Sequence, residues 1–190
     1  MIQPIVQNGD PVLRKQAHEV LVHDITSPVV KKHIKNMKDS LRDCADGLAI
    51  AAPQIGVSLR IFVVSGKFFS EKSKDDAEAQ PADREDMVFV NPVITRRSKS
   101  KSLLEEGCLS VRWKYGDILR HDKVSLVAHD EHGKKFTRGA SGLLAQVFQH
   151  ETDHLDGVLF IDEAEDLRDQ PPHEHGTHDH DHDGHTHNHA

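Results

Sequence analysis

The amino-acid sequence predicts an α+β fold. Two observations carry this prediction: short β-rich runs follow one another without a repeating strand-helix-strand unit, and a clear helical pattern appears late in the chain. The length of 190 residues is that of one domain, with a core large enough to need no disulfides. We therefore expect a single folded domain that mixes small sheets with separate helices.

The first element with a strong pattern is a helix within residues 27–45. Ser27 is a good N-cap, Pro28 suits the first helical position, and Gly47 follows the end. The apolar residues follow at steps of three and four positions: Val30, Ile34, Met37, Leu41 and Cys44. The pattern predicts one buried face, on which Cys44 packs as a small apolar side chain.

Two β-rich runs come next. Residues 59–64 are bounded by Ser65-Gly66, and residues 87–90 are closed by Asn91-Pro92. Residues 67–86 between them are crowded with Lys, Asp, Glu, Ser and Ala and show no sustained periodicity, which predicts a mobile surface loop.

A hairpin and a second helix follow. Residues 124–128 and the segment after Gly133 read as a β-hairpin, with Gly133 in the turn. Between Ser141 and Leu155 the apolar spacing is helical, and Gly157 is placed to end that helix.

Composition limits the cellular setting and the class of function. Two cysteines are too few for a secreted disulfide framework, no window approaches the roughly 18 apolar residues of a membrane span, and no basic leader is visible. We expect a cytoplasmic protein without a membrane partner. The net charge of −7 argues against specific or nonspecific nucleic-acid binding, which needs a basic footprint.

The C-terminal residues differ in composition from the rest of the chain. Eight of the 16 histidines lie in the last 18 residues, alternating with Asp and Gly, and this tract contains no Lys or Arg. We expect a folded catalytic domain over residues 1–168 and a disordered tail over residues 169–190 that holds extra Zn or Ni ions. Without basic residues, the tail gives no support for a transient contact with the ribosome.

The helix at residues 141–155 carries an HExxH motif, His150 to His154. One helical turn separates the two imidazoles, so both can reach a single metal ion, and Glu151 can hydrogen-bond a water on that ion. An exposed helix that contains the pattern by chance is the alternative. The apolar positions from Leu143 to Phe148 favour the metal site, because two His and a Glu on a buried helix are otherwise costly.

A third ligand has to come from elsewhere in the chain. Cys108 lies in a polar, glycine-containing turn, Glu105 to Ser110, where a thiolate would complete a Cys/His/His site. An ordinary buried thiol is the alternative for Cys108. Small residues surround Gln54 in the stretch from Gly47 to Gly56; its amide is able to donate to a developing oxyanion, and a plain helix-to-strand connection explains the stretch equally well.

Together these three stretches resemble the peptide deformylase family. The family's motif GxGxAAxQ corresponds to residues 47–54, EGCLS to residues 106–110, and QHExDHLxG to residues 149–157; the second and third are intact, in the same order and with similar spacing. The resemblance covers roughly residues 1–166. It implies an α+β fold in which small antiparallel sheets surround a central helix that carries HExxH.

The resemblance implies a metal-dependent hydrolase that removes the formyl group from N-formylmethionyl nascent peptides and releases formate. The implied ligands of one divalent ion, most often Fe²⁺ in the family, with Zn²⁺, Ni²⁺ or Co²⁺ as substitutes, are Cys108, His150 and His154. Glu151 would act as general base and then acid, while Gln54 and the backbone N–H of Leu109 would stabilise the oxyanion.

The methionine pocket of such an enzyme should be apolar. The candidate substrate-binding residues are those placed beside the motifs: Leu48, Ala49, Leu104, Glu106, Leu143 and Val147. Two departures from the family stand out. Ala49 replaces the second glycine of the first motif, and Arg112-Trp113 replaces the usual Pro-Gly after Val111.

Two rival functions remain open from the sequence. One is an HExxH metallopeptidase that cleaves internal peptide bonds. The other is a metal-buffering protein with a catalytically weak deformylase-like body, in which the His-rich tail carries the function.

Overall fold

The computed structural model describes residues 1–70 and 85–171. The α-helices are Pro28–Asp43 (α1), Lys67–Ser70 (α2) and Leu143–Leu155 (α3), and short 3₁₀ helices lie at Pro11–Arg14, Val22–Asp24, Ala52–Ile55 and Phe160–Asp162. The strands are Ala49–Ala51 (β1), Ile61–Val64 (β2), Met87–Arg97 (β3), Lys101–Cys108 (β4), Val111–His121 (β5), Lys123–His129 (β6), Lys135–Ser141 (β7) and Glu165–Asp169 (β8).

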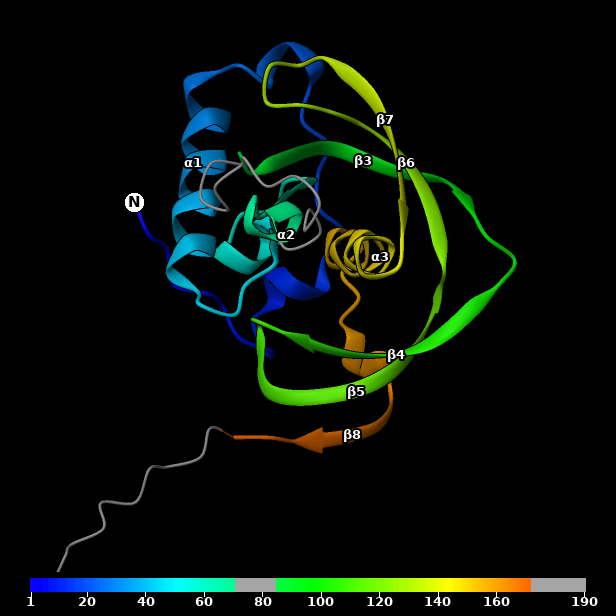
Figure 1. The fold of residues 1–190 in the computed structure, drawn as a ribbon. Helices are drawn as coiled ribbons and strands as arrows, with labels where there is room; N and C mark the ends of the chain where they lie inside the picture. Colours follow the sequence, from blue (N-terminus) through cyan, green and yellow to red (C-terminus); the bar gives the residue numbers. More distant parts are fainter. Residues whose placement is uncertain (71–84, 172–190) are drawn as a thin grey trace, which may run out of the picture.

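The described strands form two antiparallel sheets. One has the order β1-β2-β3-β6-β7 and the other the order β4-β5-β8. Figure 1 shows α3 end-on between the two sheets, with α1 on the outer side of the molecule. Helices packed on small antiparallel sheets confirm the predicted α+β class, and α3 is the helix that contains the HExxH residues. No helix in the described part of the chain is long and apolar enough to cross a membrane.

Strand β2 is covered on both faces, which explains its uninterrupted apolar sequence. Phe62 and Val64 pack in the cluster that contains the apolar side of α3, whereas Ile61 and Val63 pack in the cluster that contains the apolar side of α1. Alternate side chains of a strand point to opposite faces, so a strand between two helices needs apolar residues at every position. The predicted α1 helix is confirmed, with the Ser27 hydroxyl accepting a hydrogen bond from the Val30 N–H.

Helix α3 is fixed at its middle and at its end. The ring centroid of Phe148 lies 5.0 Å from that of Phe89 and 5.9 Å from that of Phe62, so the helix sits on β2 and β3 through an aromatic cluster. Gly157 ends the helix region with a φ of 78°, and a Cβ there would lie 2.8 Å from the carbonyl carbon of Arg14. The predicted role of Gly157 is confirmed, and the close approach of backbone leaves no room for another residue.

Asn91-Pro92 does not close the second strand, contrary to the prediction. Strand β3 continues to Arg97, with irregular register against β6 between Val90 and Val93. Asn91 adopts a φ of 51°, and its side chain both accepts from and donates to the backbone of Val20. A β-bulge therefore absorbs the residue pair that predicts a strand end, and pairing resumes beyond it.

The predicted mobile loop over residues 67–86 is wrong at its start. Lys67–Ser70 form α2, and Phe68 is buried in the same cluster as α3. At the other end, the Asp86 carboxylate pairs with Arg42 of α1 and accepts from the Gly66 N–H. The rest of that loop, residues 71–84, lies outside the described residues.

The polar turn predicted at residues 105–110 is also largely a strand. Glu105 to Cys108 belong to β4, and only Leu109 and Ser110 connect it to β5. Charged and glycine residues hide the strand because its outer face is open to solvent. At the C-terminus, β8 ends at Asp169, and the Gln170 N–H donates to the Trp113 carbonyl. The rest of the predicted tail, residues 172–190, lies outside the described residues.

Candidate active site

Helix α3 and the end of β4 bring the three candidate metal ligands together. One nitrogen from each of His150 and His154 and the sulfur of Cys108 lie within 4.8 Å of one another. The Cys108 Sγ is 3.2 Å from the His154 Nε2, and the two imidazole centroids are 4.9 Å apart. The i, i+4 spacing on a helix and the strand-end cysteine thus converge on one point, as the sequence predicts.

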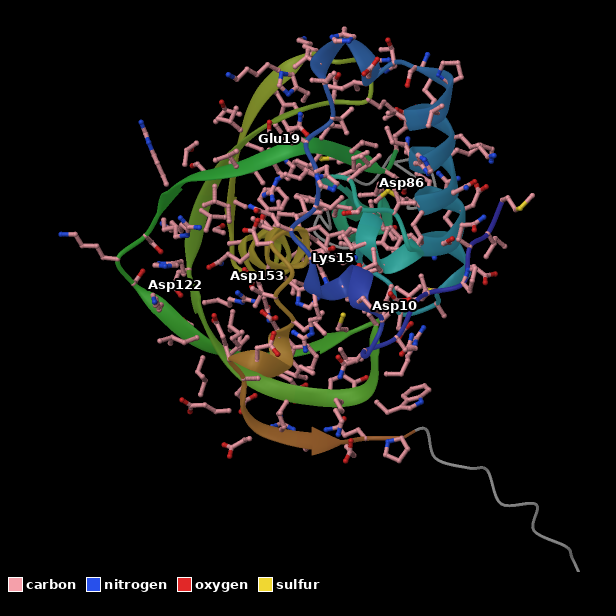
Figure 2. All side chains as sticks on the ribbon, turned by 180° about the vertical axis from the view of Figure 1, so that it is seen from behind. Asp10, Lys15, Glu19, Asp86, Asp122 and Asp153 are labelled. Carbon is pink, nitrogen blue, oxygen red and sulfur yellow. The ribbon has the colours of Figure 1, made fainter. Side chains whose placement is uncertain are left out.

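Glu106 is the centre of a buried network that orients His150. Its Oε2 lies 2.8 Å from the His150 Nδ1, and Arg120 donates to both oxygens of the same carboxylate, at 2.8 and 3.0 Å. Arg120 also donates to Asp153, which Figure 2 labels on α3, at 2.6 Å. Because Nδ1 is engaged, Nε2 is the nitrogen of His150 that is available to a metal ion.

In this network, hydrogen bonds and nearby charges lower the pKa values of two acidic groups more than burial raises them. Burial alone would raise the pKa of the Glu106 carboxyl, but hydrogen bonds from His150 and Arg120 hold that pKa at about 2. Burial would likewise raise the pKa of the Cys108 thiol, yet the neighbouring His154 and His150 bring it well below its usual value. A lowered thiol pKa favours the thiolate, the form that binds metals.

Glu151 lies beside the ligand cluster, but unlike Glu106 it has no close partners in the described part of the chain that lower its pKa below the usual value. Its side chain is buried, and its Oε2 has no hydrogen-bond partner among the described residues. Burial raises the pKa of the Glu151 carboxyl to about 7, against the attraction of the two histidines. A carboxyl group with a pKa near neutrality is suited to accept a proton and later return it.

Gln54 lies beside the cluster, in the 3₁₀ helix after β1. Its Oε1 accepts from the Ala51 N–H at 2.7 Å, and this bond fixes the amide so that Nε2 donates to the Cys108 Sγ at 3.6 Å. The stretch from Gly47 to Gly56 thus connects α1 to β2, which is one of the two interpretations, and it also forms a wall of the site. Leu109, immediately after Cys108, lines the same space.

A cavity of about 350 Å³ is lined by Gln54, Cys108, His150 and Glu151, among other residues. Five of the six candidate substrate-binding residues line it: Leu48, Ala49, Glu106, Leu143 and Val147. Leu104 does not line the cavity; it shares a face of β4 with Glu106 but lies two residues farther from Cys108. The methyl of Ala49 belongs to the apolar cluster under α3, so this departure from the family is accommodated by the core.

Four cavity residues were not singled out from the sequence: Asp46, Lys114, Tyr115 and Gln146. Gly47, Glu105, Gly107, Arg112 and Trp113, which lie in or beside the motifs, line the cavity as well. Tyr115 packs directly over Gly107, where a Cβ would meet its ring at 2.7 Å. The alternation of β5 would have placed Lys114 and Tyr115 had that strand been recognised.

Trp113 stands at the cavity rim in an unusual conformation. Its φ is 64°, in the region that favours glycine, and the resembling family usually has glycine there. The Trp113 carbonyl accepts from Gln170, and the preceding Arg112 N–H donates to Gln7 at 3.5 Å. Contacts on both sides hold a conformation that costs a bulky residue about 1–2 kcal/mol.

The donor set fits a divalent transition-metal ion. Two imidazoles and one thiolate are borderline-to-soft ligands, and a catalytic site typically has three protein ligands with one position left for water or substrate. Glu106 behind His150 supplies the supporting hydrogen bond that such sites use.

Comparisons with known proteins agree with this geometry. The family model for polypeptide deformylase matches residues 2–170. The chain is 37% identical over 169 residues to a peptide deformylase from Christiangramia forsetii, covering 88% of this chain and 84% of that protein. It is 43% identical over 161 residues to peptide deformylase 1A from Arabidopsis thaliana, covering 83% of this chain and spanning 60% of that protein's length.

A solved structure is also similar. The Met-Ala-Ser-bound peptide deformylase of Acinetobacter baumannii shares 28% identity and a TM-score of 0.72, with 86% of this chain and 99% of that one covered. The range of the family model, residues 2–170, contains Cys108 and helix α3. This chain therefore belongs to the peptide deformylase family of enzymes.

Proposed function

We propose that the enzyme removes the formyl group from N-formylmethionyl nascent peptides in a reaction that depends on one divalent metal ion. The observation that carries the proposal is the convergence of Cys108, His150 and the buried His154 on one point, beside a cavity that Cys108, His150 and Glu151 line. Family membership supports the reaction class, and the donor set supports the metal.

Each group has a role that its surroundings favour. A divalent ion bound by Cys108, His150 and His154 would supply a water-derived nucleophile at neutral pH. Glu151 takes the proton of the attacking water, whose oxygen forms the new bond to the formyl carbon. When the C–N bond breaks, Glu151 returns that proton to the leaving amine, and formate departs. Gln54 and the Leu109 N–H stabilise the negative charge on the formyl oxygen during these steps.

We propose ferrous iron as the native metal, with Zn²⁺, Ni²⁺ or Co²⁺ as substitutes. The Cys/His/His set accepts all four, and the order of intrinsic affinity puts Zn²⁺ above Fe²⁺, so supply and handling decide which ion is found. Metal analysis of protein purified without oxygen tests the proposal directly, with iron expected at about one ion per chain.

The cavity suits a methionine side chain next to the reacting group. Leu48, Leu143 and Val147 provide an apolar wall close to the metal ligands. Methionine is unbranched and polarizable, so it fills such an irregular apolar space well. The relative from Acinetobacter baumannii has been solved with the peptide Met-Ala-Ser, which begins with methionine.

The test is incubation of the anaerobically purified enzyme with formyl-Met-Ala-Ser, followed by mass spectrometry of the products. We expect formate and intact Met-Ala-Ser. Cleavage of an internal peptide bond would identify a metallopeptidase instead. An unchanged peptide, from protein that holds its metal, would favour the metal-buffering alternative.

We also propose that the tail predicted at residues 169–190, beyond Asp169 and Gln170, which contact β5, acts separately from the catalytic domain and binds extra Zn or Ni ions. Its alternating His and Asp residues supply the ligands that these ions prefer. Deletion of residues 173–190 should remove weak metal sites and leave deformylation in metal-replete buffer unchanged. Loss of activity in that buffer would show that the segment belongs to the active site.

A further inference from the structure

We propose that Trp113 is a specificity-determining residue: its indole contacts the side chains that follow the formylmethionine and favours apolar or aromatic ones. This inference rests on the proposed function, since it concerns the remainder of the same substrate. It is carried by the position of the indole, by its backbone and by the ion pair beside it.

The cavity runs from buried groups to partly exposed ones. Gln54 and Glu151 are buried, whereas Trp113 is 44% exposed. The cavity residues Leu48 and Leu143 are exposed about as much as Trp113, so all three lie toward its open side. Because the formyl group has to reach the buried groups, the rest of a peptide has to leave across the open side. There it meets a large aromatic side chain whose apolar surface is still open to solvent.

The indole is held in place by the chain at a conformational cost. A φ of 64° is rare for a bulky residue, and such outliers persist where surrounding contacts enforce them, which is most often at functional sites. The bonds from Gln170 to the Trp113 carbonyl and from the Arg112 N–H to Gln7 provide that enforcement. Glycine would meet the backbone requirement without strain, so the indole itself needs an explanation.

Arg112 is a positioning residue for this indole. Its guanidinium carbon lies 5.8 Å from the Trp113 ring centroid, and its Nη1 pairs with Asp46 at 3.1 Å. Asp46 follows α1 and lines the cavity on the side of Leu48, whereas Arg112 belongs to β5. The ion pair therefore joins two walls of the cavity at its rim and restricts the guanidinium that lies over the ring.

The size of the effect follows from aromatic contacts in general. An aromatic side chain seated against an indole contributes an amount that corresponds to about 2- to 10-fold in kcat/KM. In this proposal the methionine side chain occupies the apolar wall at Leu48, Leu143 and Val147, and the indole meets only the residues that follow it. A substrate that ends after methionine should therefore be indifferent to Trp113.

Trp113 is also the only tryptophan of the 190 residues, which makes its fluorescence a direct reporter. The full-length, metal-loaded enzyme is titrated with methionine amide and with Met-Phe-Phe, and binding of each is measured independently by inhibition of deformylation. We expect Met-Phe-Phe to shift the emission to shorter wavelength and methionine amide to leave it unchanged. Binding of Met-Phe-Phe without any change in emission would overturn the inference.

Kinetics provide the second test. Trp113→Gly should keep kcat/KM for formyl-Met amide within about 2-fold and lower kcat/KM for formyl-Met-Phe-Phe by about 2- to 10-fold, mainly through KM. Trp113→Phe should restore most of the loss. Leu119→Ala is the matched control, because Leu119 is an exposed apolar residue of β5 outside the cavity lining.

The outcomes separate this inference from the proposed function. If the wild-type enzyme deformylates neither substrate, the proposed function fails. If it deformylates both and Trp113→Gly changes both equally, or changes neither, the function stands and the role of Trp113 is wrong. Circular dichroism of each variant excludes misfolding as the cause of a loss.

Discussion

Arg120 holds both carboxylate oxygens of Glu106, through Nε at 2.8 Å and Nη2 at 3.0 Å, inside the protein. Both side chains are almost fully buried. The same Glu106 carboxylate contacts the Nδ1 of His150, so the position of one metal ligand depends on an arginine that touches neither metal nor substrate.

Replacing Arg120 by methionine should therefore affect stability and metal binding together. A buried carboxylate left without its partner costs about 3–5 kcal/mol of unfolding free energy, and loss of a supporting bond to a ligand lowers metal affinity by about 10- to 100-fold. Chemical denaturation and competition with a chelator measure the two effects. Lys35→Met is the control, because the Lys35–Asp39 pair within α1 is exposed to solvent, where ion pairs contribute little to stability. Equal stability losses in both variants would contradict this account.

The strained backbone of Trp113 gives a prediction about stability alone. Trp113→Gly and Trp113→Ala both remove the indole, but only glycine adopts a φ of 64° without strain. We expect the glycine variant to be more stable than the alanine variant by about 1 kcal/mol in thermal or chemical unfolding. An alanine variant of equal or greater stability would mean that the backbone relaxes.

Gln54→Ala should reduce the rate by about 10²- to 10³-fold, the usual effect of removing an oxyanion donor. The structure adds a stability cost of about 1–3 kcal/mol, because the buried Ala51 N–H loses its acceptor. The control is Gln146→Ala, which removes another buried glutamine of the cavity wall, one that donates to the Glu105 carbonyl rather than to Cys108. Steady-state formate release measures both variants, and a similar fall in the two would make Gln54 merely structural.

The methionine pocket is tested most cleanly at Leu143, which lines the cavity but is 45% exposed. Leu143→Ala should raise KM for formylmethionyl peptides by about 3- to 10-fold and change stability by no more than about 0.5 kcal/mol. Leu104→Ala removes the same atoms from a residue outside the cavity lining. A larger rise in KM for Leu104→Ala than for Leu143→Ala would contradict the assignment of Leu143 to the methionine pocket.

Much of the frame was predictable from local patterns. The spacing of apolar residues and the residues at the helix ends predicted α1 and α3. An unbroken apolar run predicted β2, which packs against a helix on each face. The ligand cluster was predictable for the same reason: HExxH fixes its own geometry on a helix. Cys108 was a candidate third ligand from its polar, glycine-containing surroundings, and the resemblance to the family favoured that role over a buried thiol.

The β4–β5 hairpin was not predictable because its outer face conceals the alternation. Leu103 and Leu119 are cross-strand neighbours, yet both are more than half exposed, and charged residues interrupt the apolar pattern of both strands. Because the hairpin was not recognised, Arg120 was not recognised as the partner of Glu106. Arg120 pairs in register with Ser102 and reaches back along the strand to Glu106, which only the register reveals.

Contacts between distant segments were equally inaccessible. Asp46 and Arg112 are 66 positions apart in the sequence and meet only at the cavity rim. The β-bulge at Asn91 hid the true length of β3, because an Asn-Pro pair locally favours a strand end. In both cases, tertiary contacts override what the local residues favour.

The most direct test of the central claim is formate release per bound metal ion in Glu151→Gln. Glu151 moves protons and is not a ligand in this account, so the variant should hold about one ion per chain and release formate at least about 10²-fold more slowly than the wild type. His154→Ala, which removes a ligand, should lose the ion as well. A wild-type rate per bound ion in Glu151→Gln, or loss of its metal to the same extent as in His154→Ala, would contradict the assignment of Glu151 as the proton-transferring group.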